Sequence, residues 1–206
     1  MLSVVAACGA RKITNLPLRW EGVDSPPRAT PGVAQALAAV PVALSVRDVR
    51  PDPTVVGRFD NDGGFIVRTS TNVGQYVATQ LGHMLRDNGA RLTEQPVAGI
   101  EVDLVEYACV EGGTFEGLVR LNVTVKHGRD PNGWTKMYEG TSKRWGRTHS
   151  QDNFNETLSN ALDAATRHML EDEELGRALV GEVPMGPPPG PPQGAPSEGP
   201  PGASGP

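Results

Sequence analysis

Two groups of residues in this sequence could carry catalytic chemistry. Cys109 could act as a nucleophile, because a thiolate becomes reactive when a nearby base or positive charge lowers its pKa. It lies in an apolar stretch without a basic neighbour in the sequence, so we favour a buried and unreactive thiol. Glu101, Asp103 and Glu106 could act as general acids or bases. They alternate with apolar residues, a pattern that is typical of solvated charges on the outer face of a strand.

Motifs for common enzymes and metal sites are missing from the sequence. It contains no phosphate-binding Gly-x-x-x-x-Gly-Lys-Ser/Thr, no Gly-x-Gly-x-x-Gly, no Gly-x-Ser-x-Gly and no His-Glu-x-x-His. No Cys-x-x-Cys occurs, and the histidines are far apart in the chain, at His83, His127, His149 and His168. We therefore predict a protein without enzymatic activity, cofactor or bound metal.

Cys8 is the candidate for a covalent modification. The segment Val5-Ala6-Ala7-Cys8 resembles a bacterial lipobox, in which the cysteine receives a lipid. Only Met1 to Val4 precede it, whereas a secretory leader has an apolar core of about 7–15 residues. We interpret residues 1–8 as the remnant of a lipoprotein signal with its lipobox. A chance likeness and a Cys8–Cys109 disulfide in an oxidising compartment are the alternatives.

A basic and aromatic segment is the candidate binding surface. Its cations and aromatic rings could form one patch for an anionic partner such as a glycan, a lipid or an acidic protein surface. The alternative is that the cations protect an edge strand from aggregation and pair with the acidic segment after residue 152. The members of the predicted patch are Arg120, Lys126, Arg129, Trp134, Lys136, Tyr138, Lys143, Arg144, Trp145 and Arg147.

Composition divides the chain into four parts. Residues 9–40 are rich in proline and alanine and are predicted to be a linker, residues 41–180 to be one folded domain, and residues 181–206 to be a disordered tail dominated by proline and glycine. The tail could serve as a spacer or as a ligand for a proline-binding partner, but an inert tail is favoured. A formal net charge of −5 argues against general binding of nucleic acid.

The middle of the chain has the hydrophobic periodicity of strands and helices. Residues 40–49 alternate loosely and predict a strand, and residues 54–70 predict a hairpin around an Asp-Gly turn. Three further strands are expected at 100–104, 115–125 and 134–145. Apolar residues at helical spacing predict one helix over 73–85 and another from about 152 to 169. The predicted fold class is α+β, a two-layer sandwich with a mainly antiparallel sheet and two amphipathic helices on one face.

This order of elements and several sequence strings resemble the YajG-like lipoproteins of Gram-negative bacteria. The likeness runs from about Val42 to Leu175. It includes "SVRDVRPDPTVVGRF" with an Asp-x-Arg, "RTSTNVGQYVATQLGHMLRDNGARL" as the first helix, "VDLVEYACVEGG" and "NGWTKMYEGTSKRWG" as middle strands, and "FNETLSNALDAATRHML" as the last helix. The resemblance implies a periplasm-facing protein of uncharacterised role, held by a lipid on Cys8 at the outer membrane.

The preferred functional hypothesis is therefore a lipid-anchored cell-envelope protein that acts as a non-enzymatic binding or accessory module. Its expected partners are the membrane, through Cys8, and an envelope protein or an anionic glycan or lipid. The alternative is an auxiliary component of an envelope transport or lipopolysaccharide-assembly complex. An enzyme that uses Cys109 or the acidic strand is the least favoured hypothesis.

Overall fold

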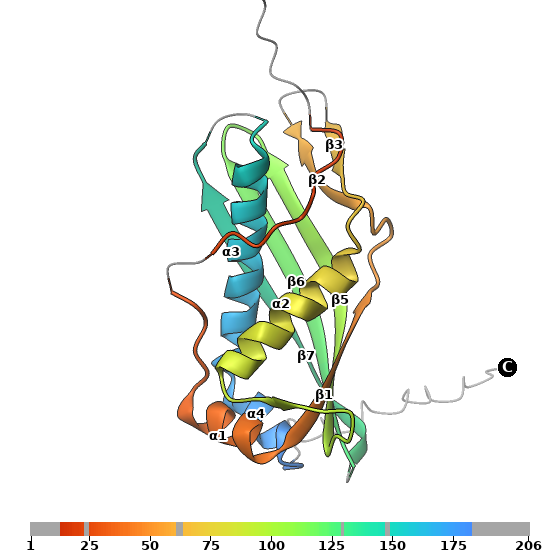
Figure 1. Ribbon diagram of the computed structural model, residues 1–206, viewed down its shortest axis with the longest axis vertical. Coiled ribbons are helices and arrows are strands. Elements are labelled where there is room, and N and C mark those ends of the chain that lie inside the picture. Colours follow the sequence, from red (N-terminus) through yellow and green to blue (C-terminus); the bar gives the residue numbers. More distant parts are fainter. Residues whose placement is uncertain (1–12, 23–24, 61–63, 129, 147–148, 183–206) are drawn as a thin grey trace, which may run out of the picture.

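A seven-stranded sheet with helices packed on one face forms the folded part of the protein (Figure 1). The computed structural model describes residues 13–22, 25–60, 64–128, 130–146 and 149–182. Cys8, Arg129 and Arg147 lie outside the described residues, as do the predicted signal remnant 1–8 and residues 183–206 of the predicted tail.

The sheet is mixed, and β5 is its central strand. β5 pairs antiparallel with β6 along its whole length, and β6 pairs antiparallel with β7. On its other side β5 pairs in parallel first with β1 and then, over its last three residues, with β2, which forms a hairpin with β3. A short β4 pairs in parallel with the first residues of β1. The strands are β1 (Pro41–Asp48), β2 (Val55–Phe59), β3 (Phe65–Arg68), β4 (Arg91–Leu92), β5 (Ala98–Glu111), β6 (Phe115–His127) and β7 (Asp130–Arg144).

Two long helices, α2 (Val73–Asp87) and α3 (Gln151–Leu170), cover the same face of the sheet (Figure 1). Each begins at a polar cap, because the side chains of Asn72 and Ser150 accept hydrogen bonds from backbone N–H groups in the first turn. Two shorter helices, α1 (Pro31–Ala39) and α4 (Glu173–Leu179), pack together at the end of the sheet opposite the β2–β3 hairpin (Figure 1). The acidic cluster after α3 caps and opens α4, where carboxylates suit the helix dipole.

Alternation of buried and more exposed residues along β6, and along β5 on either side of a bulge between Leu104 and Glu106, separates the two faces of the sheet. Val119, Leu121 and Val123 are fully buried beneath the helices, whereas the residues between them face outward. Phe154 of α3 anchors the helix layer, because its ring lies 5.3 Å from the rings of both Phe59 and Phe115. Edge-to-face packing of this kind adds to the hydrophobic stabilisation of the core.

The structure confirms the α+β prediction and adds elements that the sequence did not indicate. Antiparallel pairing provides the longest ladders, but β1, β2 and β4 join in parallel, which the predicted sheet did not include. The expected linker 9–40 contains α1, which starts at the Thr30 cap with Pro31 in its first turn. Ile13 and Leu16 in the same segment are buried in the core. These residues are part of the fold because their apolar side chains complete the core.

Candidate functional site

Cys109 lies on the helix-covered face of β5 and is fully buried. Burial raises the pKa of its thiol well above the ordinary value, and the carboxylate of Glu111 adds to the shift. A thiol in this environment stays protonated and has no access to a substrate in solution. The geometry is that of a core residue.

Glu101, Asp103 and Glu106 lie on the outer face of the sheet, and each is bound to a cation on a neighbouring strand. Arg47 forms a bidentate pair with Asp103, with N–O distances of 2.9 and 3.0 Å. Nζ of Lys126 lies 2.7 Å from Glu101, and Arg120 donates to Glu106 at 2.8 Å. These carboxylates form cross-strand ion pairs and do not converge on a common point.

The structure divides the predicted basic and aromatic patch between the two faces of the sheet. Arg120, Lys126 and Lys143 lie on the outer face, and Lys143 pairs with Glu116 at 2.6 Å. Lys136 and Arg144 lie on the helix-covered face, where Lys136 binds Asp172 and Glu174 and Arg144 binds Glu156. The described cations therefore serve as partners for carboxylates, which reduces the positive potential that they offer to a ligand.

The aromatic members of the patch are just as dispersed. Tyr138 is buried and donates a hydrogen bond of 2.6 Å to Asp172, the residue that caps α4. Trp134 is half-buried against the core, near the start of β7. Trp145 follows the other end of β7 and is 79% exposed. One surface cannot use all three rings.

The described part of the chain also bears on metal binding and on membrane spans. Within it, no three His, Cys, Asp or Glu side chains come together in a way that could hold a metal ion. In the same residues, no helix has the length and the apolar character needed to cross a bilayer.

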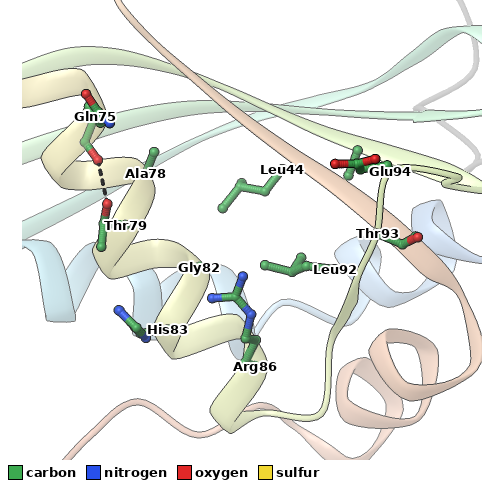
Figure 2. Close-up of a pocket in the computed structure, with 11 residues that line it drawn as sticks. Leu44, Gln75, Ala78, Thr79, Gly82, His83, Arg86, Leu92, Thr93 and Glu94 are labelled. Carbon is green, nitrogen blue, oxygen red and sulfur yellow. Dashed lines mark hydrogen bonds between the residues drawn. The ribbon is translucent and has the colours of Figure 1, made fainter.

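A groove lies between α2 and the edge of the sheet (Figure 2). It arises because β4 pairs only with Pro41 and Val42 and then turns away, which leaves the rest of β1 without a neighbour on that side. The groove has a volume of about 590 Å³. Its lining residues are Ala43, Leu44, Gln75, Ala78, Thr79, Gly82, His83, Arg86, Leu92, Thr93 and Glu94.

The backbone of β1 presents free hydrogen-bonding groups to this groove. On the groove side, the carbonyl of Val42 accepts a hydrogen bond from the Thr93 N–H. On the other side, the N–H of Val49 donates to the carbonyl of Leu104 in β5, so odd-numbered residues bond to β5. Because backbone groups alternate in direction along a parallel ladder, the N–H and C=O of Leu44 and Val46 point to the free side of β1, where Leu44 lines the groove and Val46 lies beyond its lining residues. Within the described residues no strand pairs with them there. Gly74 of α2 packs against Asp48 and closes the far end of this edge.

The groove walls combine apolar and charged side chains. Leu44 and Leu92 face each other across it, and Gly82 leaves the space between them open (Figure 2). The guanidinium of Arg86 points into the groove beside Leu92, and Glu94 lies on the opposite rim (Figure 2). In the described part of the chain neither side chain has an ion-pair partner. An extended peptide would find both a backbone template and a free cation here.

This groove was not predicted from the sequence. The hydrophobic periodicity predicts the strand at 40–49 and the helix at 73–85 but not how they lie relative to each other. The small residues Ala78 and Gly82 at helical spacing are the only local signal, and they do not show which sheet edge the helix approaches. Because β4 has only two residues, it shows no periodicity from which its end could be predicted.

Taken together, the described part of the chain is an α+β domain with an ion-paired outer sheet face and one grooved edge. A family model described as "uncharacterized lipoprotein" matches residues 27–180, and the chain belongs to this YajG-like lipoprotein family. The match begins just before α1, so the matched region includes that helix. No curated protein matches the sequence.

Several solved structures resemble the protein at low sequence identity. A Xanthomonas campestris protein is 11% identical with a TM-score of 0.49, covering 78% of this chain and 93% of its own. A lipoprotein candidate from Caulobacter crescentus is 13% identical with a TM-score of 0.45, covering 73% and 97%. A PelC dodecamer from Paraburkholderia phytofirmans is 13% identical with a TM-score of 0.37, covering 72% and 95%. None of these likenesses bears on function.

Proposed function

We propose that this protein is a lipid-anchored cell-envelope lipoprotein and a non-enzymatic binding module, which receives an extended segment of a partner protein along the free edge of β1. The observation that carries the proposal is the pair of unpaired backbone positions, Leu44 and Val46, on the free edge of β1, of which Leu44 lines a groove walled by α2. Unpaired strand edges are templates for an added strand, and natural proteins normally cover or charge them.

The chemistry of the groove specifies the partner segment. Backbone hydrogen bonds to Leu44 and Val46 would supply much of the affinity, and alternate side chains would enter the groove between Leu44 and Leu92. Arg86 favours an acidic side chain at one position of the segment, because its guanidinium has no carboxylate partner in the described residues. The partner is therefore an extended peptide with small or apolar residues and one carboxylate.

Membership of the lipoprotein family supports the anchor and the compartment. Cys8 in its lipobox-like setting is the proposed site of the lipid, and an outer-membrane position facing the periplasm is the proposed location. A multiply acylated cysteine would hold the protein stably, since each buried methylene contributes about 0.8 kcal/mol. The binding module itself needs no membrane-spanning segment.

The non-enzymatic role is supported by the state of the residues that could have carried chemistry. The Cys109 thiol is buried with a raised pKa. Glu101, Asp103 and Glu106 are occupied by ion pairs on an open sheet face. The groove contributes hydrogen-bonding and charged groups for recognition, without a paired nucleophile and base among its described lining residues.

The binding proposal is tested by photocrosslinking in the native host. A photoreactive residue in place of Thr79, on the groove wall, is expected to give an adduct whose crosslinked peptide maps to an extended segment of one envelope protein. Val46→Pro is the matched variant, because it removes an N–H on the free edge of β1 and spares the pairing with β5. A photoreactive residue at Thr135, on the outer sheet face, is the position control. An adduct that survives Val46→Pro, or that also forms at Thr135, would overturn the proposal.

The anchor is tested by the intact mass of the protein purified from host membranes and expressed from its natural start. Acyl mass beginning at Cys8, and its loss in Cys8→Ala, is the expected result. A wild-type protein that retains Met1 and carries no lipid would refute the anchor. If the crosslinked partner were a transporter or an outer-membrane barrel, the protein would instead be an auxiliary component of that machine.

A further inference from the structure

The beginning of the described chain fixes which end of the domain lies next to an anchor. Asn15 forms a parallel bridge with Arg68 of β3, and Leu16 donates its N–H to the Arg68 carbonyl at 2.8 Å. Ile13 is buried in the core. Because the bridge is parallel, the chain before Asn15 runs toward Phe65, the first residue of β3. The β2–β3 hairpin end of the sheet is therefore where the N-terminal segment arrives.

The same end of the sheet carries an exposed tryptophan. One row of register partners crosses the sheet from Arg144 of β7 to Phe65 of β3, by way of Phe115, Glu111 and Phe59. Trp145 comes directly after this row and is 79% exposed. Ile66 of β3 is also exposed, at 42%. Two large apolar side chains thus reach solvent at one end of the sheet.

The covalent distance from Cys8 to the folded domain is short. Ile13, which is buried, follows Cys8 by five positions in the sequence. A fully extended chain between their Cα atoms spans at most about 18 Å. The 13 residues of β6 span about 43 Å along the sheet. A lipid on Cys8 would therefore hold the hairpin end near the bilayer, while the end with α1 and α4 could not reach it.

We propose that the hairpin end of the domain rests on the lipid bilayer, with Trp145 in the interfacial region. This inference rests on the proposed attachment of lipid to Cys8. Indole side chains favour the membrane–water interface, because the ring is apolar and its N–H can still hydrogen-bond. Among the described residues at this end, Arg58 pairs with Asp60 and Arg144 with Glu156, so the proposed contact does not rest on anionic lipid.

This orientation leaves the groove accessible. Leu44 pairs with Ile100, which is 11 residues along β5 from Glu111 at the hairpin end. At about 3.3 Å per residue, the groove lies roughly 35 Å from the bilayer side of the domain. A partner segment could therefore bind β1 without displacing the protein from the membrane.

Quenching of tryptophan fluorescence by brominated lipid tests the orientation. The full-length, non-acylated chain is coupled through Cys8 to a maleimide lipid in phosphatidylcholine vesicles, and the buried Cys109 does not compete for the reagent. Replacing the lipid with its brominated form is expected to remove about one third of the emission, the share of one tryptophan among three. Trp145→Phe should abolish the quenching. Trp134→Phe, which changes a tryptophan near the other end of β7, should retain it.

Equal quenching in Trp145→Phe and the wild type, or loss of quenching in Trp134→Phe alone, would overturn the inference. If Trp134→Phe fails to fold, the comparison of the wild type with Trp145→Phe decides, because an exposed side chain tolerates this change. The chemical tether separates this test from that of the anchor. Absence of natural acyl mass would refute lipidation of Cys8, whereas a tethered domain without quenching of Trp145 would refute the orientation.

Discussion

Arg50 and Asp48 form a buried, bidentate ion pair at the end of β1. The guanidinium donates to the two carboxylate oxygens at 2.8 and 2.7 Å, and the Arg50 side chain is only 6% exposed. It also donates to the carbonyls of Pro53, Val55 and Tyr107. One side chain thus joins the end of β1 to β2 and β5. The Asp-x-Arg of the family resemblance is therefore a structural pair in this chain.

Arg50→Ala is predicted to lower the free energy of unfolding by about 3–5 kcal/mol, because it leaves the Asp48 carboxylate and three carbonyls without their partner. Urea denaturation followed by circular dichroism measures the change. Arg47→Ala is the matched control, since its pair with Asp103 is exposed and contributes little to stability. Equal effects of the two variants would show that Arg50 has no special role.

Gly140→Ala is predicted to disrupt the contact between β7 and α3. A Cβ on Gly140 would lie 2.1 Å from the Ala161 carbonyl oxygen and 2.2 Å from the Ala165 nitrogen, so the strand and the helix would have to separate. Overpacking of this kind costs about 1–3 kcal/mol. Thermal unfolding should show the loss, and Gly128→Ala, where a Cβ meets nothing within 4 Å, should leave the melting temperature unchanged. A melting temperature for Gly140→Ala that matches the control would contradict the close packing.

The strongest local patterns predicted the elements well. The alternation at 115–125 marks β6, and the helical spacing at 73–85 marks α2, because each pattern reports a single face packed on one core. The basic segment could not be interpreted in the same way. Lys136 and Lys143 are seven residues apart in β7 and so lie on opposite faces, each beside a carboxylate that the local sequence does not place there.

The N-terminal arm escaped prediction for a different reason. Beyond the short bridge between Asn15 and Arg68, its backbone binds side chains, as where Arg19 donates its N–H to Asn155 and Glu21 to Ser159. Such contacts leave no periodicity in the sequence. The groove could not be predicted either. It depends on the unpaired edge of β1, which begins where β4 ends, and the sequence pattern does not define the end of β4.

Tyr138→Phe is predicted to weaken the attachment of α4 in a pH-dependent way. Burial alone would raise the pKa of Asp172, but hydrogen bonds from Tyr138, Lys136 and the Glu174 N–H outweigh it and hold the pKa below its ordinary value. A lowered carboxyl pKa stabilises the fold above the unfolded value of 3.8, and this stabilisation is lost as pH falls through the folded pKa.

Removing the Tyr138 hydroxyl should therefore raise the pKa of Asp172 and cost about 1.5–3 kcal/mol at pH 7, as expected for a hydrogen bond to a charged group. The difference from the wild type should shrink below pH 3.8. Carboxyl NMR titration and urea denaturation at several pH values measure the two effects. A stability difference that is the same at pH 7 and at pH 3 would argue against a role for the Asp172 charge.

Cys109 is predicted to react with a thiol reagent only after unfolding. Its side chain is fully buried and its thiol pKa is raised by burial, so both access and thiolate content are low in the native protein. Mass spectrometry after treatment with iodoacetamide should find Cys109 unmodified in buffer and modified in concentrated urea. Cys109→Ser provides the control for site assignment. Rapid labelling of Cys109 in the native protein would instead support the hypothesis that it is a reactive, functional thiol.

Asn155→Ala is predicted to release the N-terminal arm from α3. The Asn155 side chain accepts from the Arg19 N–H at 3.1 Å and donates to the Pro17 carbonyl at 3.2 Å, and the residue is 2% exposed. Its loss leaves both backbone groups without these bonds, at a cost of about 1–3 kcal/mol. Limited proteolysis should cut the arm faster in Asn155→Ala than in the wild type or in Asn122→Ala on the outer sheet face. Equal rates of cleavage in Asn155→Ala and in the wild type would contradict this role of Asn155.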